Sequence, residues 1–238
     1  MKLAIMQPYF FPYLGYWQLI HAADKFVIYD DVNYIKGGWI NRNRILINGK
    51  PVYITVPLHK ASPYKRICDI VLQSGQAWRD KLVRMVEITY RKAPYFDAVF
   101  PVIEKLIRHE VVNLSDYLAH QIQALVLFMD IKTELVTTSR SYCNDHLNGQ
   151  ARLLEICRFE KADTYLNPEG GQALYNSAAF RNSGFDLRFL VMRPLPYKQR
   201  ASSFLPYLSL IDVLMETGPA GVKYHLEAFD LIEPALNA

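Results

Sequence analysis

Two short apolar runs near the start of the chain, Leu3–Met6 and Phe26–Asp30, flank a segment with helical periodicity, Leu14–Ala23. Runs of this length are typical of buried strands, and the spacing of the apolar residues between them is typical of a helix. Two strands joined by a helix are expected to pair in parallel through a right-handed crossover. The beginning of the chain therefore predicts an α/β unit with a crevice outside the carboxyl ends of its strands.

A β-hairpin is predicted after this unit. The runs Arg44–Ile47 and Val52–Val56 flank the dipeptide Asn48–Gly49. This dipeptide favours a type I′ turn, because the turn requires positive φ at both of its central residues.

The middle of the chain has the pattern of amphipathic helices, and strand and helix patterns alternate again after it. We therefore predict an α/β fold with a Rossmann-like, largely parallel sheet and a β-hairpin. The whole chain, 1–238, is predicted to form a single domain with a helical insert at about 70–135. The further predicted helices are Trp78–Arg91, Tyr95–His109, Leu114–Met129, Arg152–Lys161 and Gln172–Phe180, and the further strands are Cys68–Leu72, Lys132–Thr137, Thr164–Leu166 and Leu187–Leu190.

The composition is that of a globular protein, with 51% hydrophobic and 21% charged residues. A net charge of +4 suits an anionic small molecule, but the basic residues are not clustered as nucleic-acid binding requires. Three widely spaced cysteines, Cys68, Cys143 and Cys157, predict neither a disulfide framework nor a metal site. The sequence shows no signal-peptide pattern and no apolar run of membrane-spanning length, so a cytoplasmic protein without a membrane span is expected.

Two adjacent carboxylates, Asp30 and Asp31, end the second predicted strand. Side chains alternate along a strand, so one of the two is expected to face the crevice. Asp30 is the candidate catalytic carboxylate and Asp31 a candidate substrate-binding residue. A magnesium ligand and a solvated strand end are the alternatives.

The predicted first helix carries a candidate base, His21. It lies one turn after Trp17 and two turns after Tyr13, so these three residues share a face of the helix. If this face lines the crevice, His21 is able to accept a proton while Tyr13 and Trp17 contact the substrate. The alternative is a structural histidine that is bonded to a backbone carbonyl.

A cationic segment follows, in which Arg42 and Arg44 alternate with two asparagines. In an extended chain both guanidinium groups lie on the same side. Guanidinium forks bind phosphates bidentately, which favours a nucleotide-sugar diphosphate or CoA as the ligand, whereas the alternative is a charged edge strand. Further candidate substrate contacts are Gln7 and Asn33 as hydrogen-bond donors, and Lys36 and Trp39 beside the arginines.

Seven blocks of the sequence match the pattern of a known protein family. They are Gln7–Trp17, Asp30–Val32, Trp39–Arg44, Arg152–Cys157, Thr164–Leu166, Gly170–Gly171 and Phe204–Leu214. Through these blocks the chain resembles the WbqC-like proteins over nearly its whole length. It departs from their pattern near Asn167–Pro168, where a serine-glycine pair is expected, and near Leu195, where a histidine is expected. The resemblance implies a bacterial protein of O-antigen or other surface-glycan biosynthesis, a family for which aminoacyl transfer, notably of glycine, is the proposed activity.

We therefore expect a transferase that attaches an acyl or aminoacyl group, with glycyl as a candidate, to an amino sugar. Its expected partners are a nucleotide-sugar or another small-molecule substrate, with acyl-CoA or an acyl or aminoacyl carrier protein as the donor. One alternative is an ATP- and magnesium-dependent amide ligase, because a strand, a proline-containing loop, Gly15, a helix and an acidic strand end also occur in nucleotidylyltransferases. The other alternative is a non-catalytic sugar-nucleotide-binding protein of the glycan assembly machinery.

Overall fold

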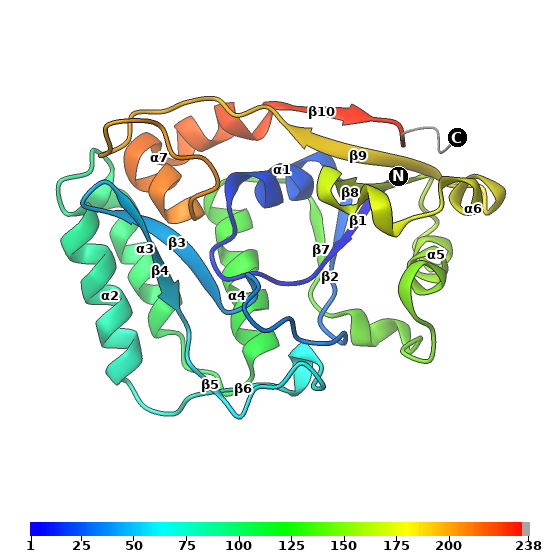
Figure 1. The fold of residues 1–238 in the computed structure, drawn as a ribbon, viewed down its shortest axis with the longest axis horizontal. Helices are drawn as coiled ribbons and strands as arrows, with labels where there is room; N and C mark the ends of the chain where they lie inside the picture. Colours follow the sequence, from blue (N-terminus) through cyan, green and yellow to red (C-terminus); the bar gives the residue numbers. More distant parts are fainter. Residues whose placement is uncertain (235–238) are drawn as a thin grey trace.

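The computed structural model describes residues 1–234. Its main sheet has the strand order β10-β9-β8-β1-β2-β7, and every neighbouring pair is parallel except β9 with β10 (Figure 1). Read from β7 and counted along the chain, these strands follow the order 3-2-1-4-5-6 of doubly wound Rossmann-like sheets. The strands are β1 (Lys2–Met6), β2 (Lys25–Ile28), β7 (Glu134–Val136), β8 (Thr164–Pro168), β9 (Asp186–Met192) and β10 (Phe229–Ile232).

Both faces of the sheet are buried, which explains why its central strands are apolar with little alternation. On one face Ala4 and Phe26 pack in the same cluster as residues of α1 and α7. On the other face Leu3 and Val27 pack with residues of α5 and α6. The helices are α1 (Leu14–Ala22), α2 (Ala77–Tyr90), α3 (Phe96–Arg108), α4 (Leu114–Phe128), α5 (Gly149–Phe159), α6 (Ser177–Asn182) and α7 (Leu210–Leu226).

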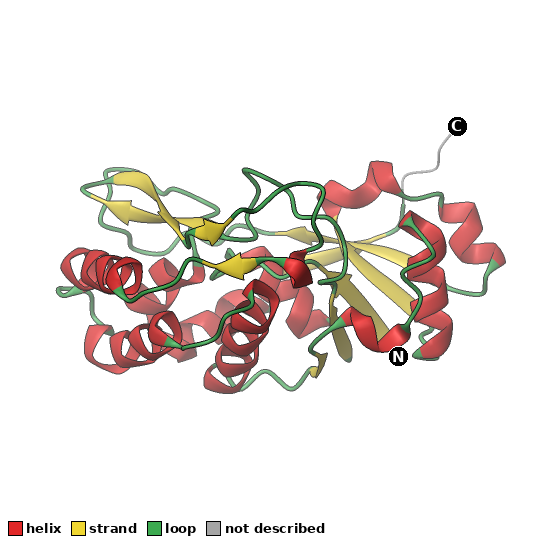
Figure 2. Ribbon diagram, turned by 90° about the horizontal axis from the view of Figure 1, so that it is seen from below, coloured by secondary structure: helices red, strands yellow, loops and turns green. Residues whose placement is uncertain are grey.

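The segment between β2 and β7 forms a lobe beside the main sheet (Figure 2). It contains helices α2, α3 and α4 and the predicted hairpin. At the turn, Asn48 and Gly49 have φ values of 51° and 75°, as a type I′ turn requires. The strands of this lobe are β3 (Arg42–Ile47), β4 (Lys50–Thr55), β5 (Leu58–His59) and β6 (Val71–Leu72).

The predicted fold class, the parallel pairing of β1 with β2 and the hairpin are confirmed. The prediction of one continuous helix over Gln172–Phe180 is wrong. The chain forms a 3₁₀ segment, Glu169–Leu174, and then α6, because the side chain of Asn176 accepts a hydrogen bond from the Ala179 N–H and starts a new helix. The predicted strand Cys68–Leu72 is reduced to the two residues of β6. No helix among residues 1–234 combines the length and apolar character needed to cross a membrane.

Candidate functional site

The doubly wound topology places a cavity at the carboxyl edge of the sheet. From β1 the chain moves to β2 on one side, whereas β8 leads to β9 on the other, so the direction of winding changes between β1 and β8. Ligands of open α/β sheets bind at such switch points. A cavity of about 460 Å³ lies there, with Gln7 after β1, Tyr29 after β2 and Asn167 at the end of β8 in its walls.

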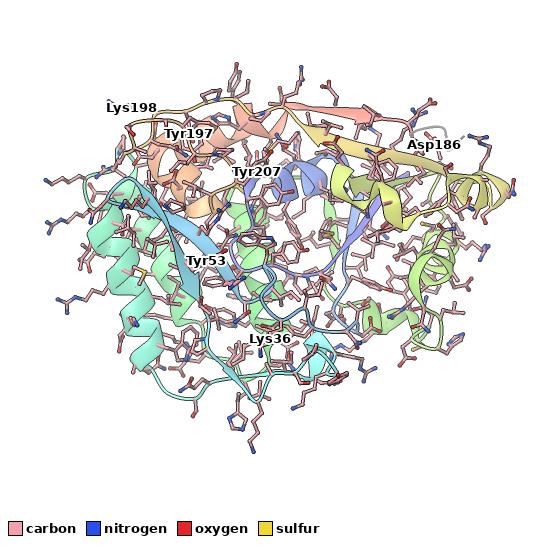
Figure 3. The ribbon with its side chains drawn as sticks, in the orientation of Figure 1. Lys36, Tyr53, Asp186, Tyr197, Lys198 and Tyr207 are labelled. Atoms are coloured by element: carbon pink, nitrogen blue, oxygen red, sulfur yellow. The ribbon has the colours of Figure 1, made fainter. Side chains whose placement is uncertain are left out.

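A second cavity, of about 280 Å³, adjoins the first. The two share the side chains of Tyr9, Tyr13 and Trp39 as walls. The second cavity is completed by residues of β3 and of the loop before α7, including Tyr207, which Figure 3 shows above the hairpin residue Tyr53. We call the two cavities together the aromatic groove. Its other lining residues are Ile5, Met6, Tyr16, Ile35, Asn43, Arg44, Leu153, Tyr165, Pro168, Gly170, Gly171, Leu174 and Tyr175.

The loop that carries Tyr9 and Tyr13 is held in an unusual conformation. Phe11, a fully buried residue, has a φ of 40°, which is uncommon for a residue other than glycine. Its N–H donates to Gln121 Oε1 on α4 at 2.8 Å. Its carbonyl accepts from Asn43 Nδ2 on β3 at 2.7 Å and from Ser209 Oγ, just before α7, at 2.9 Å. Three elements thus fix the backbone between the two groove tyrosines.

The tyrosines of the groove are neutral hydrogen-bonding groups. Burial, and to a lesser degree the neighbouring Tyr13, raises the pKa of Tyr9 to about 12. Burial likewise raises the pKa of Tyr13, Tyr29 and Tyr175. All four phenols therefore stay protonated at neutral pH and are able to donate hydrogen bonds to a ligand.

At the end nearest β8, Asn167 is oriented by two phenols. Its Nδ2 is 2.9 Å from the Tyr165 oxygen and 3.1 Å from the Tyr175 oxygen. A Cβ atom at Gly171 would lie 2.1 Å from Asn167 Oδ1, so only glycine permits this close approach. The segment Asn167–Gly171 thus contributes to the wall of the cavity.

At the opposite end lies Arg44, whose guanidinium carbon is 5.4 Å from the centre of the Trp39 ring. Its Nε is buried without a hydrogen-bond partner, and no carboxylate among residues 1–234 forms an ion pair with it. Arg42 differs, since its guanidinium donates to the carbonyls of Gly37 and Gly38 and lies 4.5 Å from the Tyr53 ring centre. Arg42 lines neither cavity. The two arginines share a side of the strand, and Arg44 is the one positioned to meet an anion.

Asp30 lies outside the groove and is fully buried. Its carboxylate accepts hydrogen bonds from Ser115 Oγ at 2.6 Å, Thr138 Oγ1 at 2.9 Å and Ser139 N at 3.0 Å. Arg140 Nε lies 3.4 Å away. In this arrangement the carboxylate is already used by the protein, and it joins the end of β2 to the start of α4.

Asp31 also lies beyond the end of β2, and its carboxylate and that of Asp30 both contact Ser139 Oγ. The expected alternation of the two side chains is therefore not met, because the strand ends at Ile28. Asp31 is buried and forms an ion pair with Arg152 of α5, which is also buried. The guanidinium carbon of Arg152 is 4.9 Å from the centre of the Tyr29 ring, so this ion pair lies behind the wall of the groove. It supports that wall and does not face the cavity.

The remaining predicted residues divide between the groove and other places. Gln7, Tyr13, Trp39 and Arg44 come together in the groove. His21 is exposed at the end of α1, and Asn33 and Lys36 are also exposed. Trp17 is fully buried and donates from Nε1 to the Pro12 carbonyl at 3.0 Å. Of the residues expected to line one crevice, Gln7, Tyr13 and Arg44 do so, whereas His21, Asp30 and Arg42 do not. The face of α1 that carries Trp17 packs into the core.

The lining of the groove suits binding more than proton transfer. None of its lining residues is an aspartate, glutamate, histidine, cysteine or lysine. Within residues 1–234, no cluster of three or more histidine, cysteine, aspartate or glutamate side chains is arranged to hold a metal ion. The groove offers aromatic faces, neutral hydrogen-bonding groups and the guanidinium of Arg44.

Sequence reasoning missed several groove residues, chiefly Tyr29, Asn167, Gly171 and Tyr207. Tyr29 directly precedes the two aspartates and was available as a signal, because in an extended chain its side chain lies on the opposite side from that of Asp30. Tyr207 has a φ of 61° and lies in an irregular loop, where no periodic pattern points to it.

The fold and the groove define a doubly wound α/β protein with a candidate ligand-binding cavity at its switch point. The model of the WbqC-like protein family matches residues 7–224, and the chain belongs to this family. It is 26% identical over 226 residues to "Uncharacterized protein Rv1507c" of Mycobacterium tuberculosis (strain ATCC 25618 / H37Rv), a match that covers 94% of this chain and 96% of that protein. No solved structure matches the chain significantly.

The hydrogen bond between the Phe11 N–H and Gln121 predicts that mutation of Gln121 lowers the stability of the protein. Gln121→Met removes the acceptor of the buried Phe11 N–H and should lower the free energy of unfolding by about 1–3 kcal/mol. Gln123 lies on the same helix but is exposed, so Gln123→Met should change stability by less than about 0.5 kcal/mol. Urea denaturation of both variants provides the measurement. Equal stability of the two variants would contradict the role assigned to Gln121.

The buried network of Asp30 predicts a structural phenotype. Asp30→Asn places an amide NH₂ against groups that donate hydrogen bonds, so it should destabilise the protein by on the order of 3 kcal/mol. The exposed neighbour Asp116 is the control, and Asp116→Asn should have little effect on the same denaturation curve. An Asp30→Asn protein of unchanged stability would contradict the structural role of Asp30 and would favour direct contact of this carboxylate with a ligand.

Proposed function

We propose that the protein is a transferase that binds a phosphorylated or nucleotide-linked amino sugar in the aromatic groove and attaches an acyl or aminoacyl group, with glycyl as a candidate, to it. The observation that carries this proposal is the distribution of chemistry along the groove. Neutral aromatic and amide side chains lie at the sheet end, and Arg44 lies at the other end.

The sheet end suits a sugar ring. Aromatic faces pack against the apolar faces of a pyranose, and phenol and amide groups form hydrogen bonds with its hydroxyls. Tyr9, Tyr13 and Tyr29 provide such faces, while Gln7 and Asn167 provide amides. A site with these properties favours a polar but uncharged ring over an anionic one.

The other end suits a phosphate. Arg44 lines the second cavity and forms no ion pair with another residue of 1–234, so a phosphate bound there would compensate the charge of its guanidinium. Trp39 lies beside this guanidinium and presents a ring on which a nucleobase or a second sugar is able to stack. The two ends together favour a ligand with one neutral ring and one anionic group.

In the proposed reaction the sugar amine attacks the carbonyl carbon of a thioester, held as acyl-CoA or on a carrier protein. The new C–N bond replaces the C–S bond, the thiolate leaves, and the proton lost by the amine passes to water or to the thiolate. Phenols and amides of the groove are available as donors to the oxyanion that develops on the carbonyl.

A second candidate function is that of a non-catalytic sugar-nucleotide-binding protein. It is supported by the lack of any carboxylate, imidazole, amine or thiol among the lining residues of the groove, since such groups usually act as general bases. Incubation of a UDP-linked amino sugar with glycyl and acetyl thioesters, followed by mass spectrometry of the product, separates the two functions. An arm with ATP and magnesium tests for an amide ligase.

The cationic end of the groove predicts a difference between two neighbouring arginines. Arg44→Ala should weaken the binding of UDP-N-acetylglucosamine by about 1.5–3 kcal/mol, the range of a charge-assisted hydrogen bond. Arg42→Ala should weaken it much less, because the Arg42 guanidinium is bonded to backbone carbonyls. Isothermal titration calorimetry measures both affinities.

Uncharged N-acetylglucosamine is the control ligand, and both variants should bind it like the unmodified protein. The loss for Arg44→Ala should shrink as salt rises, because screening weakens the contact that is removed. Identical affinities of the unmodified and Arg44→Ala proteins for the UDP-sugar would rule out Arg44 as the phosphate-binding residue.

A further inference from the structure

Two adjoining segments with exposed side chains, 33–36 and 60–66, lie at the edge of the groove. The segment 33–36 runs antiparallel to the loop 60–66, since Asn33 and Arg66 form a bridge and the Tyr34 N–H donates to the Lys65 carbonyl at 2.9 Å. The loop turns at Ser62–Lys65, where the Lys65 N–H donates to the Ser62 carbonyl at 3.0 Å, and this turn carries Tyr64 while the adjoining segment carries Ile35. Both are unusually exposed for apolar side chains, Ile35 to 53% and Tyr64 to 92%.

The same two segments carry positive charges that have no ion-pair partner among residues 1–234. Lys36, Lys60 and Lys65 are exposed, and none of them forms an ion pair with another described residue. The neighbouring Arg66 differs, because Asp69 and Asp145 compensate its charge. We call the set Ile35, Lys36, Lys60, Tyr64 and Lys65 the Tyr64 tip.

We propose that the Tyr64 tip docks the protein on an anionic phospholipid surface. Lysines near a bilayer are attracted by its negative surface potential, and a tyrosine ring is stable at the level of the headgroups. With two apolar side chains at a turn, the tip is far smaller than a specific protein interface, which takes about 20–30 residues a side. It offers ammonium groups and a tyrosine ring but no unpaired guanidinium fork, which favours lipid headgroups over a nucleic acid.

Docking in this way orients the aromatic groove. Ile35 belongs to the Tyr64 tip and also lines the first cavity. When the tip rests on a bilayer, one edge of the groove mouth therefore lies at the level of the headgroups. This inference rests on exposed charges and apolar side chains, so it holds or fails independently of the proposed transferase activity.

The test is co-sedimentation of the full chain with vesicles of equal parts phosphatidylglycerol and phosphatidylethanolamine, and with vesicles of phosphatidylcholine. The unmodified protein should bind only the anionic vesicles, and less as salt rises. Replacing Lys36, Lys60 and Lys65 by glutamine should weaken binding on the order of 100-fold, since each basic residue contributes about a fivefold factor. Tyr64→Ser should also weaken it.

Matched control variants distinguish an effect of the Tyr64 tip from an effect of the net charge of the protein. Lys50, Lys92 and Lys198 are exposed and form no ion pair with described residues, and Figure 3 shows Lys198 far from Lys36. Their replacement by glutamine removes the same charge and should leave vesicle binding nearly unchanged. Tyr224→Ser, at a residue that is 70% exposed on α7, is the control for Tyr64→Ser.

Three results would overturn the proposal. The first is that the unmodified protein fails to bind anionic vesicles, and the second is that it binds both kinds of vesicle equally. The third is that the two lysine triples lose binding to the same degree, which would show a general charge effect. Binding to an acidic protein or to RNA that depends on the tip, without vesicle binding, would assign the surface to that partner instead.

Discussion

The backbone of Phe11 is the constraint on which the groove depends. A non-glycine residue with positive φ costs on the order of 1–3 kcal/mol and persists only where its surroundings determine it. Here Gln121, Asn43 and Ser209 each form a hydrogen bond with this single residue. Because they come from α4, β3 and the start of α7, the same bonds that hold the loop also place the lobe and the last helix against the sheet.

The two carboxylates that follow β2 also hold the elements around the groove together, from positions outside its lining. Asp30 joins the strand to α4 and the loop after β7, and Asp31 joins it to α5 through Arg152. A buried carboxylate is tolerated only with enough donors, and both have them. The sheet edge is therefore charged inside the protein and neutral where it faces the cavity, which is the reverse of what two acids at a strand end suggest.

The sequence predicts those parts of the fold that local patterns encode. The apolar runs predict β1 and β2, and Asn48–Gly49 predicts the hairpin turn. Both signals are local, because hydrophobic periodicity and turn preferences depend on a few neighbouring residues. The helix α7 and the strand β10 were not predicted, since Gly218–Pro219 interrupts the helical pattern and β10 is an edge strand of four residues, too short to show a periodic pattern. The groove was found only in part, because Asn167 and Gln7 line the same cavity through the pairing of β8 with β1, which is a long-range contact.

The neutral lining of the groove has a consequence for the proposed chemistry. An amine reacts with an acyl donor as the free base, and a carboxylate beside it would stabilise the ammonium form and raise its pKa. A groove of phenols and amides, with Arg44 as its cation, acts in the opposite direction, because both desolvation and the positive charge disfavour an ammonium. A bound amino sugar would thus lose its proton more readily than in water. The electrostatics of the groove would thus assist the proposed transfer, and walls without a general base are compatible with it.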